Sequence, residues 1–292
     1  MVSEPRFDAV TGRYLLTEIA AKQQRIYVEQ AGHGIPLLCL HTAGTDTRQY
    51  RSMLNDAEIT DRFRVIAFDL PWHGKSSPPA GFQNGLYRLT ADLYVESIMA
   101  VVRGLKLDKP VVMGCSIGGR IVLHLLMRHA QEFGAAIGVQ TSHRVVGRLT
   151  AAQNELQYLN RSDVHGSEAA AGLVSGLMAP QSPAEDRWET LWHYMQGGPG
   201  VFSGDTYFYK DSGNLDIAAL SSIDTSITPL YLLSGEYDYS STPAMTQEVH
   251  RMIPGSKFIL MTNLGHFAVS ENYRHFRTFL IPVLKEIEAN RR

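Results

Sequence analysis

The sequence has little of three features that mark whole classes of protein: cysteine, long apolar runs and an excess of charge of one sign. Its 292 residues include two cysteines, too few for the disulfide framework of a small secreted protein. The 27 Lys and Arg nearly balance the 29 Asp and Glu, whereas proteins that bind nucleic acid or anionic membranes normally carry a basic excess. We therefore expect no nucleic-acid and no membrane partner.

Signals for export or membrane insertion are also missing. Every apolar stretch is interrupted by Gly, His or a charged residue well before the ~20 residues that a membrane span needs. The first residues are polar and acidic, where a secretory signal begins with a basic region and an apolar core. Cys39 and Cys115 lie in apolar runs typical of buried strands. These features predict a cytoplasmic protein with reduced thiols.

Sequence patterns that hold metals or nucleotides are absent as well. There is no His-Glu-x-x-His and no Cys-x-x-Cys pair. The glycines between Gly114 and Gly119 do not follow the Gly-x-Gly-x-x-Gly spacing, and no Lys-Ser/Thr pair follows them. We expect neither a metal nor a cofactor.

What the sequence does contain is an alternation of short apolar runs with longer amphipathic stretches, which is typical of an α/β fold with a mostly parallel sheet. Amphipathic spacing predicts helices over 89–105, 118–129, 242–252 and 274–290. The apolar runs predict strands over 25–30, 36–40, 64–69, 110–115, 135–140, 229–234 and 257–261, with a weaker one over 14–19.

One interval breaks this alternation. The chain from Gln140 to Pro229 is far longer than the ~30 residues that a βαβ unit needs, so a segment is inserted there. Between Trp188 and Tyr209 the insertion is rich in aromatic residues. Such a density indicates apolar surface facing a pocket, although packing between the inserted helices explains any single ring equally well.

The most informative motif is Gly114-Cys115-Ser116-Ile117-Gly118. It lies between an apolar run and a helical run, which is the context of a nucleophile elbow. The glycines allow a tight turn that presents the serine hydroxyl, and the start of the following helix favours negative charge beside it. We interpret Ser116 as a nucleophile.

A serine nucleophile needs a base, and the base needs an acid to orient it. Asp238 follows one predicted strand and His266 follows the last, which gives the chain order serine, acid, histidine. Glu236 is the competing acid. The other histidines fit less well, since four of them lie within predicted helices: His124, His129, His250 and His275.

A second loop predicts the oxyanion hole. The run from Leu37 leads into His41-Thr42-Ala43-Gly44, where small residues allow a backbone N–H to approach a substrate oxygen. We expect the N–H groups of Ile117 and Ala43 to be the two donors, with Thr42 as the alternative to Ala43.

These motifs, with Asp69-Leu-Pro-Trp72-His-Gly and Gly265-His266, resemble the α/β-hydrolase fold family over nearly the whole chain. The resemblance is to its cap-bearing esterases, lactonases and carbon–carbon bond hydrolases. It implies an eight-stranded, mostly parallel sheet in a core of residues 1–141 and 214–292. A helical cap is expected at 142–213, inserted after the sixth strand. Thr42 and Trp72 depart from the family pattern, which has glycine at both positions.

The resemblance implies a serine hydrolase that cleaves a small or medium, partly apolar ester or lactone, and the near-neutral net charge suits a weakly charged substrate. The alternative is a hydrolase of carbon–carbon bonds in ring-cleavage products, for which Arg144, Arg148, Arg161 or Arg187 would bind the substrate carboxylate. A ligand receptor on the same scaffold is a third hypothesis, and a homodimer is possible. Expected substrate-binding residues are His41, Thr42, Trp72, Trp188, Trp192 and Phe267.

Overall fold

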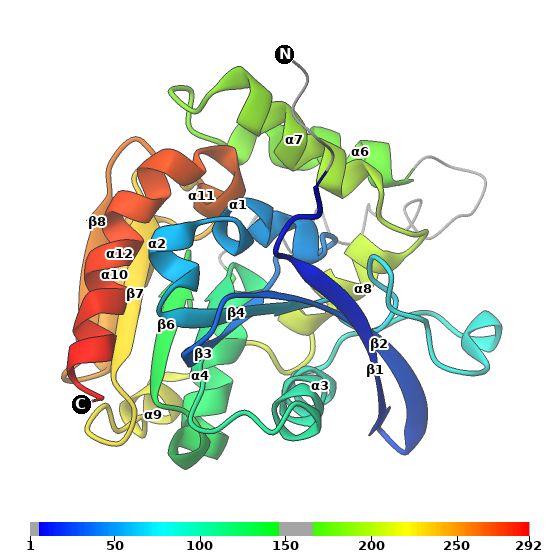
Figure 1. Ribbon diagram of the computed structural model, residues 1–292, viewed down its shortest axis with the longest axis horizontal. Helices are drawn as coiled ribbons and strands as arrows, with labels where there is room; N and C mark the ends of the chain where they lie inside the picture. The colour runs from blue at the N-terminus through cyan, green and yellow to red at the C-terminus, as the bar shows by residue number, and fades with distance from the viewer. Residues whose placement is uncertain (1–5, 146–165, 292) are drawn as a thin grey trace.

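The computed structural model describes residues 6–145 and 166–291, in which the chain forms one eight-stranded sheet (Figure 1). The strand order is β1-β2-β4-β3-β5-β6-β7-β8, and all neighbours from β4 to β8 are parallel. This confirms the predicted mostly parallel sheet. The strands are β1 (Thr11–Ile19), β2 (Lys22–Ala31), β3 (Ile35–Leu40), β4 (Phe63–Phe68), β5 (Val111–Cys115), β6 (Ala135–Val139), β7 (Leu230–Gly235) and β8 (Lys257–Met261).

The central strands are buried on both faces, and their side chains alternate between two cores. In β3, Leu38 and Leu40 pack in one core while Leu37 and Cys39 pack in the other. Burying one such leucine contributes about 1.5–3 kcal/mol. This two-sided burial explains why the strands read as continuous apolar runs.

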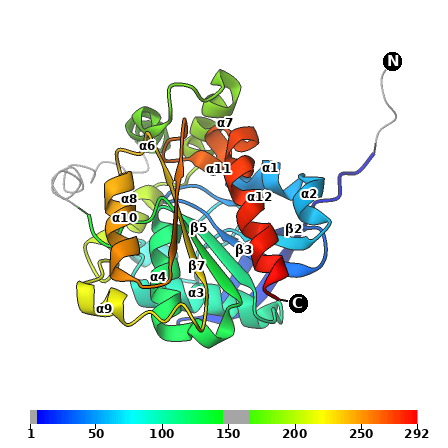
Figure 2. The same cartoon turned by 90° about the vertical axis from the view of Figure 1, so that its left-hand side faces the viewer.

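Helices cover both faces of the sheet (Figure 2). On one face lie α3 (Ala91–Gly104), α4 (Ile117–His129) and α10 (Pro243–Met252), and on the other lie α1 (Arg51–Leu54), α2 (Ala57–Thr60) and α12 (Tyr273–Ala289). The four long helices begin and end within two residues of their predicted bounds. The short elements η1 (Thr47–Tyr50), η2 (Phe82–Asn84), η3 (Ala130–Glu132) and α11 (Ala268–Glu271) were not predicted.

The described part of the segment between β6 and β7 is helical. It contains α6 (Gly166–Val174), η5 (Ser175–Leu177), α7 (Ala184–Met195), α8 (Val201–Thr206), η6 (Tyr207–Tyr209) and α9 (Ile217–Ser221). Figure 1 shows α6 and α7 beyond one end of the sheet, and α7 contacts α11 there. The division into a core and a cap at 142–213 stays a prediction.

The order of strands places a crevice at the carboxyl ends of β3 and β5. From β3 the chain proceeds outward to β4 on one side, whereas from β5 it proceeds to β6 on the other side. Ligands in open α/β sheets bind at such a switch point. Within residues 6–145 and 166–291, no helix combines the length and apolar character that crossing a bilayer requires.

Candidate active site

Ser116 occupies the turn between β5 and α4 with a backbone that L-residues rarely adopt, φ 59° and ψ −113°. A Cβ at Gly114 would lie 2.1 Å from the carbonyl oxygen of Gly118. A Cβ at Gly118 would lie 2.6 Å from the carbonyl oxygen of Leu40. Both contacts are with backbone, so glycine is needed on either side of Ser116, as a nucleophile elbow requires.

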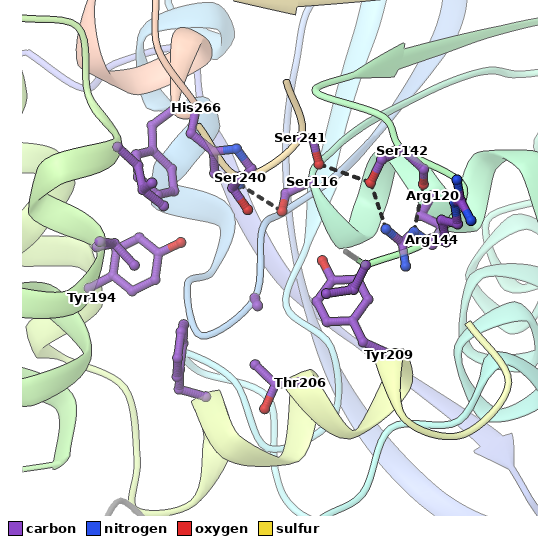
Figure 3. A pocket seen from close by; sticks show the side chains of 16 residues that line it. Ser116, Arg120, Ser142, Arg144, Tyr194, Thr206, Tyr209, Ser240, Ser241 and His266 are labelled. Carbon is purple, nitrogen blue, oxygen red and sulfur yellow. Dashed lines mark hydrogen bonds between the residues drawn. The ribbon is translucent and has the colours of Figure 1, made fainter. Parts of the chain in front are cut away.

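A chain of hydrogen bonds joins Ser116, His266 and Asp238. The Ser116 Oγ lies 2.8 Å from His266 Nε2, and His266 Nδ1 lies 2.8 Å from Asp238 Oδ2 (Figure 3 draws the first bond). A carboxylate only accepts, so Nδ1 carries the proton and Nε2 is free to accept the serine proton. The Asp238 Oδ1 accepts from the backbone N–H groups of Ser240 and Ser241 at 2.8 and 2.9 Å. The arrangement has the geometry of a Ser–His–Asp triad.

Glu236, the competing acid, and the other histidines of predicted helices make hydrogen bonds outside the triad. The Glu236 carboxylate accepts from the Asn263 N–H at 2.9 Å and makes no hydrogen bond with His266 among the described residues. His124 is buried beside Gly213, and burial lowers its pKa to about 4. The remaining helical histidines bond locally, His129 to Glu132, His250 to Ser256 and His275 to Thr262.

The turn after β3 leaves one N–H group available. The Thr42 N–H donates to Gln49 Oε1 at 2.8 Å, and the Gly44 N–H donates to Asp205 Oδ2 at 2.7 Å. Among the described residues, no hydrogen bond uses the Ala43 N–H between them. The Ile117 N–H belongs to the first turn of α4, where helix N–H groups have no intrahelical partner. This favours Ala43 over Thr42 as the second oxyanion donor.

A buried ion pair fixes that turn. The Asp205 carboxylate, on α8, also accepts from Tyr87 Oη and from His73 Nε2, both at 2.8 Å. His73 Nδ1 lies 3.0 Å from the Pro71 carbonyl, so both ring nitrogens donate and the ring is an imidazolium. Burial alone would lower the pKa of His73, but the Asp205 carboxylate outweighs it and raises the pKa. Burial likewise opposes ionisation of Asp205, yet His73 lowers its pKa.

The triad opens into a cavity of about 90 Å³ between the sheet and the inserted helices. Figure 3 shows His266 on one side of Ser116 and the side chains of Ser142, Arg120 and Arg144 on the other. The described residues that line it are Ala43, Ser116, Arg120, Ser142, Arg144, Val145, Val174, Leu177, Tyr194, Phe202, Thr206, Tyr209, Ser240, Ser241, His266 and Phe267.

Of the six expected substrate-binding residues, Phe267 lines the cavity and packs edge-on against His266, with ring centroids 4.9 Å apart. His41 does not line it, because both of its ring nitrogens bond to backbone, Nδ1 to Thr42 O and Nε2 to Leu70 N–H. Burial and the neighbouring His73 lower the pKa of His41 to about 4. His41 therefore holds the oxyanion turn as a neutral ring.

The other four expected residues do not line the cavity either. The Thr42 hydroxyl lies behind the lining and bonds to Tyr194 Oη at 2.9 Å. Trp72 adopts φ 78° and stacks on Tyr87 under its loop, away from the triad. Trp188 and Trp192 stack on each other outside the cavity, and Trp188 is 66% exposed.

Most residues that line the cavity were not predicted as site residues, among them Tyr194, Tyr209 and Arg120. Tyr194 and Tyr209 belong to the aromatic segment of the insertion, where sequence alone does not show which rings face inward. Arg120 lies two residues after the elbow, in the helical run that follows it, and no sequence motif marks it as a site residue. Its side chain reaches Ser142 and Asn214 and packs over the Tyr209 ring.

Of the four arginines considered for a substrate carboxylate, Arg144 lines the cavity and lies 3.6 Å from Glu248. Arg187 is in α7 and does not line it. Arg148 and Arg161 lie outside the described residues. Over 6–145 and 166–291, no three His, Cys, Asp or Glu side chains come together as a metal site.

Comparison with known proteins gives one family model, described as the alpha/beta hydrolase fold, which matches residues 35–167. The fold is similar to a thermophilic esterase from Thermogutta terrifontis, with 18% identity, 95% and 99% of the two chains covered and a TM-score of 0.81. It is also similar to the enol-lactonase from Burkholderia xenovorans LB400, with 17% identity, 92% and 100% coverage and a TM-score of 0.76.

In sequence, the chain is 30% identical over 116 residues to 2-hydroxymuconate semialdehyde hydrolase from Pseudomonas sp. (strain CF600). This alignment covers 39% of each chain. At the crevice of this sheet a serine, a histidine and an aspartate are joined by hydrogen bonds, which is the arrangement that serine hydrolases use. The family model and the solved structures show that the chain has the alpha/beta-hydrolase fold.

Proposed function

We propose that the protein is a serine hydrolase that cleaves a small carboxylic ester or lactone through an acyl-enzyme on Ser116. The observation that carries the proposal is the Ser116–His266–Asp238 chain of hydrogen bonds beside the N–H groups of Ala43 and Ile117, which have no hydrogen-bond partner among the described residues. The small cavity above Ser116 supports a small substrate. The esterase and lactonase folds to which the chain is similar point to the same reaction class.

The geometry suits a two-step reaction. His266 Nε2 takes the Ser116 proton while Oγ attacks the substrate carbonyl, and the N–H groups of Ala43 and Ile117 stabilise the oxyanion. His266 then gives that proton to the leaving alcohol, which breaks the carbon–oxygen bond. A water molecule, deprotonated by His266, hydrolyses the acyl-enzyme and restores Ser116. Asp238 keeps His266 in the required tautomer throughout.

We propose that residues 142–213 act as a cap over this site. The Gly44 N–H donates to Asp205, Thr42 bonds to Tyr194, and the His266 N–H donates to the Leu177 carbonyl at 2.8 Å. Each of these contacts joins the insertion to a loop that carries the site. The insertion thereby closes the cavity from above and keeps water away from the reacting carbonyl.

The decisive experiment is Ser116→Ala. We expect hydrolysis of a panel of short aryl and alkyl esters to fall by about 10⁴-fold or more, with an unchanged unfolding curve, because nothing replaces the nucleophile. Ser222→Ala, which removes an exposed hydroxyl, is the matched control and should keep full activity. Full activity of Ser116→Ala would refute the proposal.

Labelling separates an enzyme from a receptor on the same scaffold. A fluorophosphonate probe should add its phosphonyl group to Ser116 in the folded wild-type protein, as read by peptide mass spectrometry. Folded protein that is not labelled at Ser116 would favour a ligand receptor.

A second candidate function is hydrolysis of a carbon–carbon bond in a ring-cleavage product. The arginines in the cavity, Arg120 and Arg144, favour it, as does the similarity to 2-hydroxymuconate semialdehyde hydrolase. A substrate panel that compares esters, lactones and ring-fission products distinguishes the two. Rapid ester turnover without activity on ring-fission products supports the first candidate, and the reverse supports the second.

A further inference from the structure

We propose that Arg120 binds a carboxylate of the substrate, so that the preferred ester is the half-ester of a short dicarboxylic acid. This inference rests on the proposed function and adds to it the chemical class of the acyl group. It concerns the part of the cavity on the side of Ser116 opposite His266, where Figure 3 shows Arg120, Ser142 and Arg144 together.

The first observation is that Arg120 is buried and held in place. Its exposed fraction is 2%. Nε donates to the Ser142 carbonyl and Nη2 to the Ser142 hydroxyl, both at 2.6 Å, while Nη1 donates to Asn214 Oδ1 at 2.9 Å. A guanidinium has five N–H donors, so two are not used by these partners. The Tyr209 ring lies against its face at 4.6 Å.

The second observation is that this positive charge has no negative partner among the described residues. All three hydrogen-bond acceptors of Arg120 are neutral. Burial lowers the pKa of Arg120 to about 10, so the side chain is protonated at neutral pH. A buried charge is costly unless it is paired, and the described lining of the cavity includes no Asp or Glu. A substrate carboxylate would supply the missing anion.

The third observation is that Arg120 and Ser116 line the same cavity and lie four residues apart at the start of α4. Ser116 caps the N-terminus of α4, and the Arg120 N–H donates to the Ser116 carbonyl at 2.9 Å. Residues four apart lie on the same face of a helix, about 6 Å apart along its axis. A substrate whose carbonyl reaches Ser116 can therefore place a carboxylate on Arg120 across a few methylene groups.

Arg144 has a lesser part in this subsite. Its side chain is 57% exposed, and Glu248 lies 3.6 Å away. Solvent and Glu248 screen its charge, so it attracts anions to the mouth of the cavity more than it fixes them. The positive and negative charges of the whole chain nearly balance, but Arg120 and Arg144 make this part of the cavity locally positive.

A pair of substrates of the same shape tests the inference. Monoethyl glutarate and ethyl pentanoate release the same alcohol, and a carboxylate in the first replaces a methyl group in the second. We expect the wild-type enzyme to hydrolyse monoethyl glutarate with a kcat/KM about 10- to 100-fold higher, since a bidentate hydrogen-bonded carboxylate is recognised strongly by arginine. Release of acid is followed in a pH-stat. Equal values for the two esters would overturn the inference.

Variants then assign the preference to Arg120. In Arg120→Met the ratio of the two kcat/KM values should fall to near one, whereas Arg120→Lys should keep part of it, because lysine retains the charge without the planar fork. Arg251→Gln, at an exposed arginine that does not line the cavity, is the control and should leave the ratio unchanged. A purely structural role of Arg120 would lower both kcat/KM values together and leave the ratio unchanged, which would also overturn the inference.

Binding measured in a variant without the nucleophile tests the carboxylate site independently of the proposed hydrolase activity. In Ser116→Ala, calorimetry should show tighter binding of monoethyl glutarate than of ethyl pentanoate, and the difference should be lost when Arg120→Met is added. Absence of that difference refutes the carboxylate site even if the wild-type enzyme is an active esterase. Lack of any ester hydrolysis with the binding difference intact refutes only the proposed function.

Discussion

Two buried carboxylates hold the two loops of the site, and they are stabilised in different ways. Asp205, on the insertion, accepts from the Gly44 N–H beside the proposed oxyanion donor and pairs with a protonated His73. Glu271, on α11 of the core, accepts from the Gly265 N–H next to His266 and from two groups of the insertion, the Ala179 N–H and the Ser182 hydroxyl. Asp205 is paired with a cation. Among the described residues, Glu271 accepts only from neutral N–H and O–H groups.

This difference decides the direction of each pKa. Burial raises the pKa of both carboxyl groups, but His73 outweighs burial at Asp205 and the pKa there is lowered. At Glu271 the N–H and hydroxyl donors do not outweigh burial, and its pKa is raised. A full positive charge therefore stabilises a buried anion more than several hydrogen bonds do at this site. The two halves of the site should respond differently to mutation and to pH.

The largest effect is expected for Asp205→Asn. The change removes the negative charge and leaves His73 buried without its anion, which costs about 3 kcal/mol of unfolding free energy. The turn that carries Ala43 should also loosen, so kcat falls more than KM changes. Urea unfolding and ester kinetics measure the two effects. Asp211→Asn, an exposed neighbour, is the control, and equal behaviour of the two variants would contradict the prediction.

A smaller effect is expected for Glu271→Gln. The glutamine keeps one acceptor oxygen but turns an amide N–H₂ toward the N–H groups that the carboxylate accepts, which costs about 1–2 kcal/mol. No buried cation is left unpaired, so the loss stays below that of Asp205→Asn. The same unfolding assay compares them, with the exposed Glu132→Gln as the control. A loss larger than that of Asp205→Asn would remove the distinction between the two carboxylates.

The smallest effect is a pH dependence of the ion pair. The pKa of His73 is raised from its usual 6.5, so its contribution to stability is present below that value and is lost as pH rises through the folded pKa. The stability difference between wild type and Asp205→Asn should therefore shrink at alkaline pH, by at most ~1.4 kcal/mol per pH unit. The folded pKa of Asp205 is lowered from 3.8, so its contribution is lost only in strong acid. A difference that is constant from pH 6 to pH 10 would argue against a charged His73.

Sequence was sufficient for the fold because the central strands are buried on both faces and the long helices on one. Apolar runs such as those of β5 and β7, and the stripe of Phe276, Leu280 and Val283 in α12, mark their elements directly. The short helices α1, α2 and α11 carry too few residues for a periodic pattern. Their positions depend on tertiary packing, which sequence periodicity does not contain.

For the site, the sequence motif predicts residues at positions where backbone geometry dictates the residue type. Gly114 and Gly118 are required by contacts with backbone atoms, and the chain order of serine, acid and histidine follows from the fold. Five of the six expected substrate-binding residues do not line the described cavity, because which aromatic ring faces it depends on how the inserted helices rotate. The partners of His41 are backbone atoms, which leave no side-chain pattern in the sequence.

The hydrogen bond from the His266 N–H to the Leu177 carbonyl means that the insertion is not an exchangeable module. A chimera that takes its insertion from another protein would have to bring a carbonyl to the same place, or leave the His266 amide without this partner. It would also have to supply an acceptor where Asp205 meets Gly44. Substrate scope in this chain is therefore more readily altered by changing side chains such as Arg120 than by replacing the segment above them.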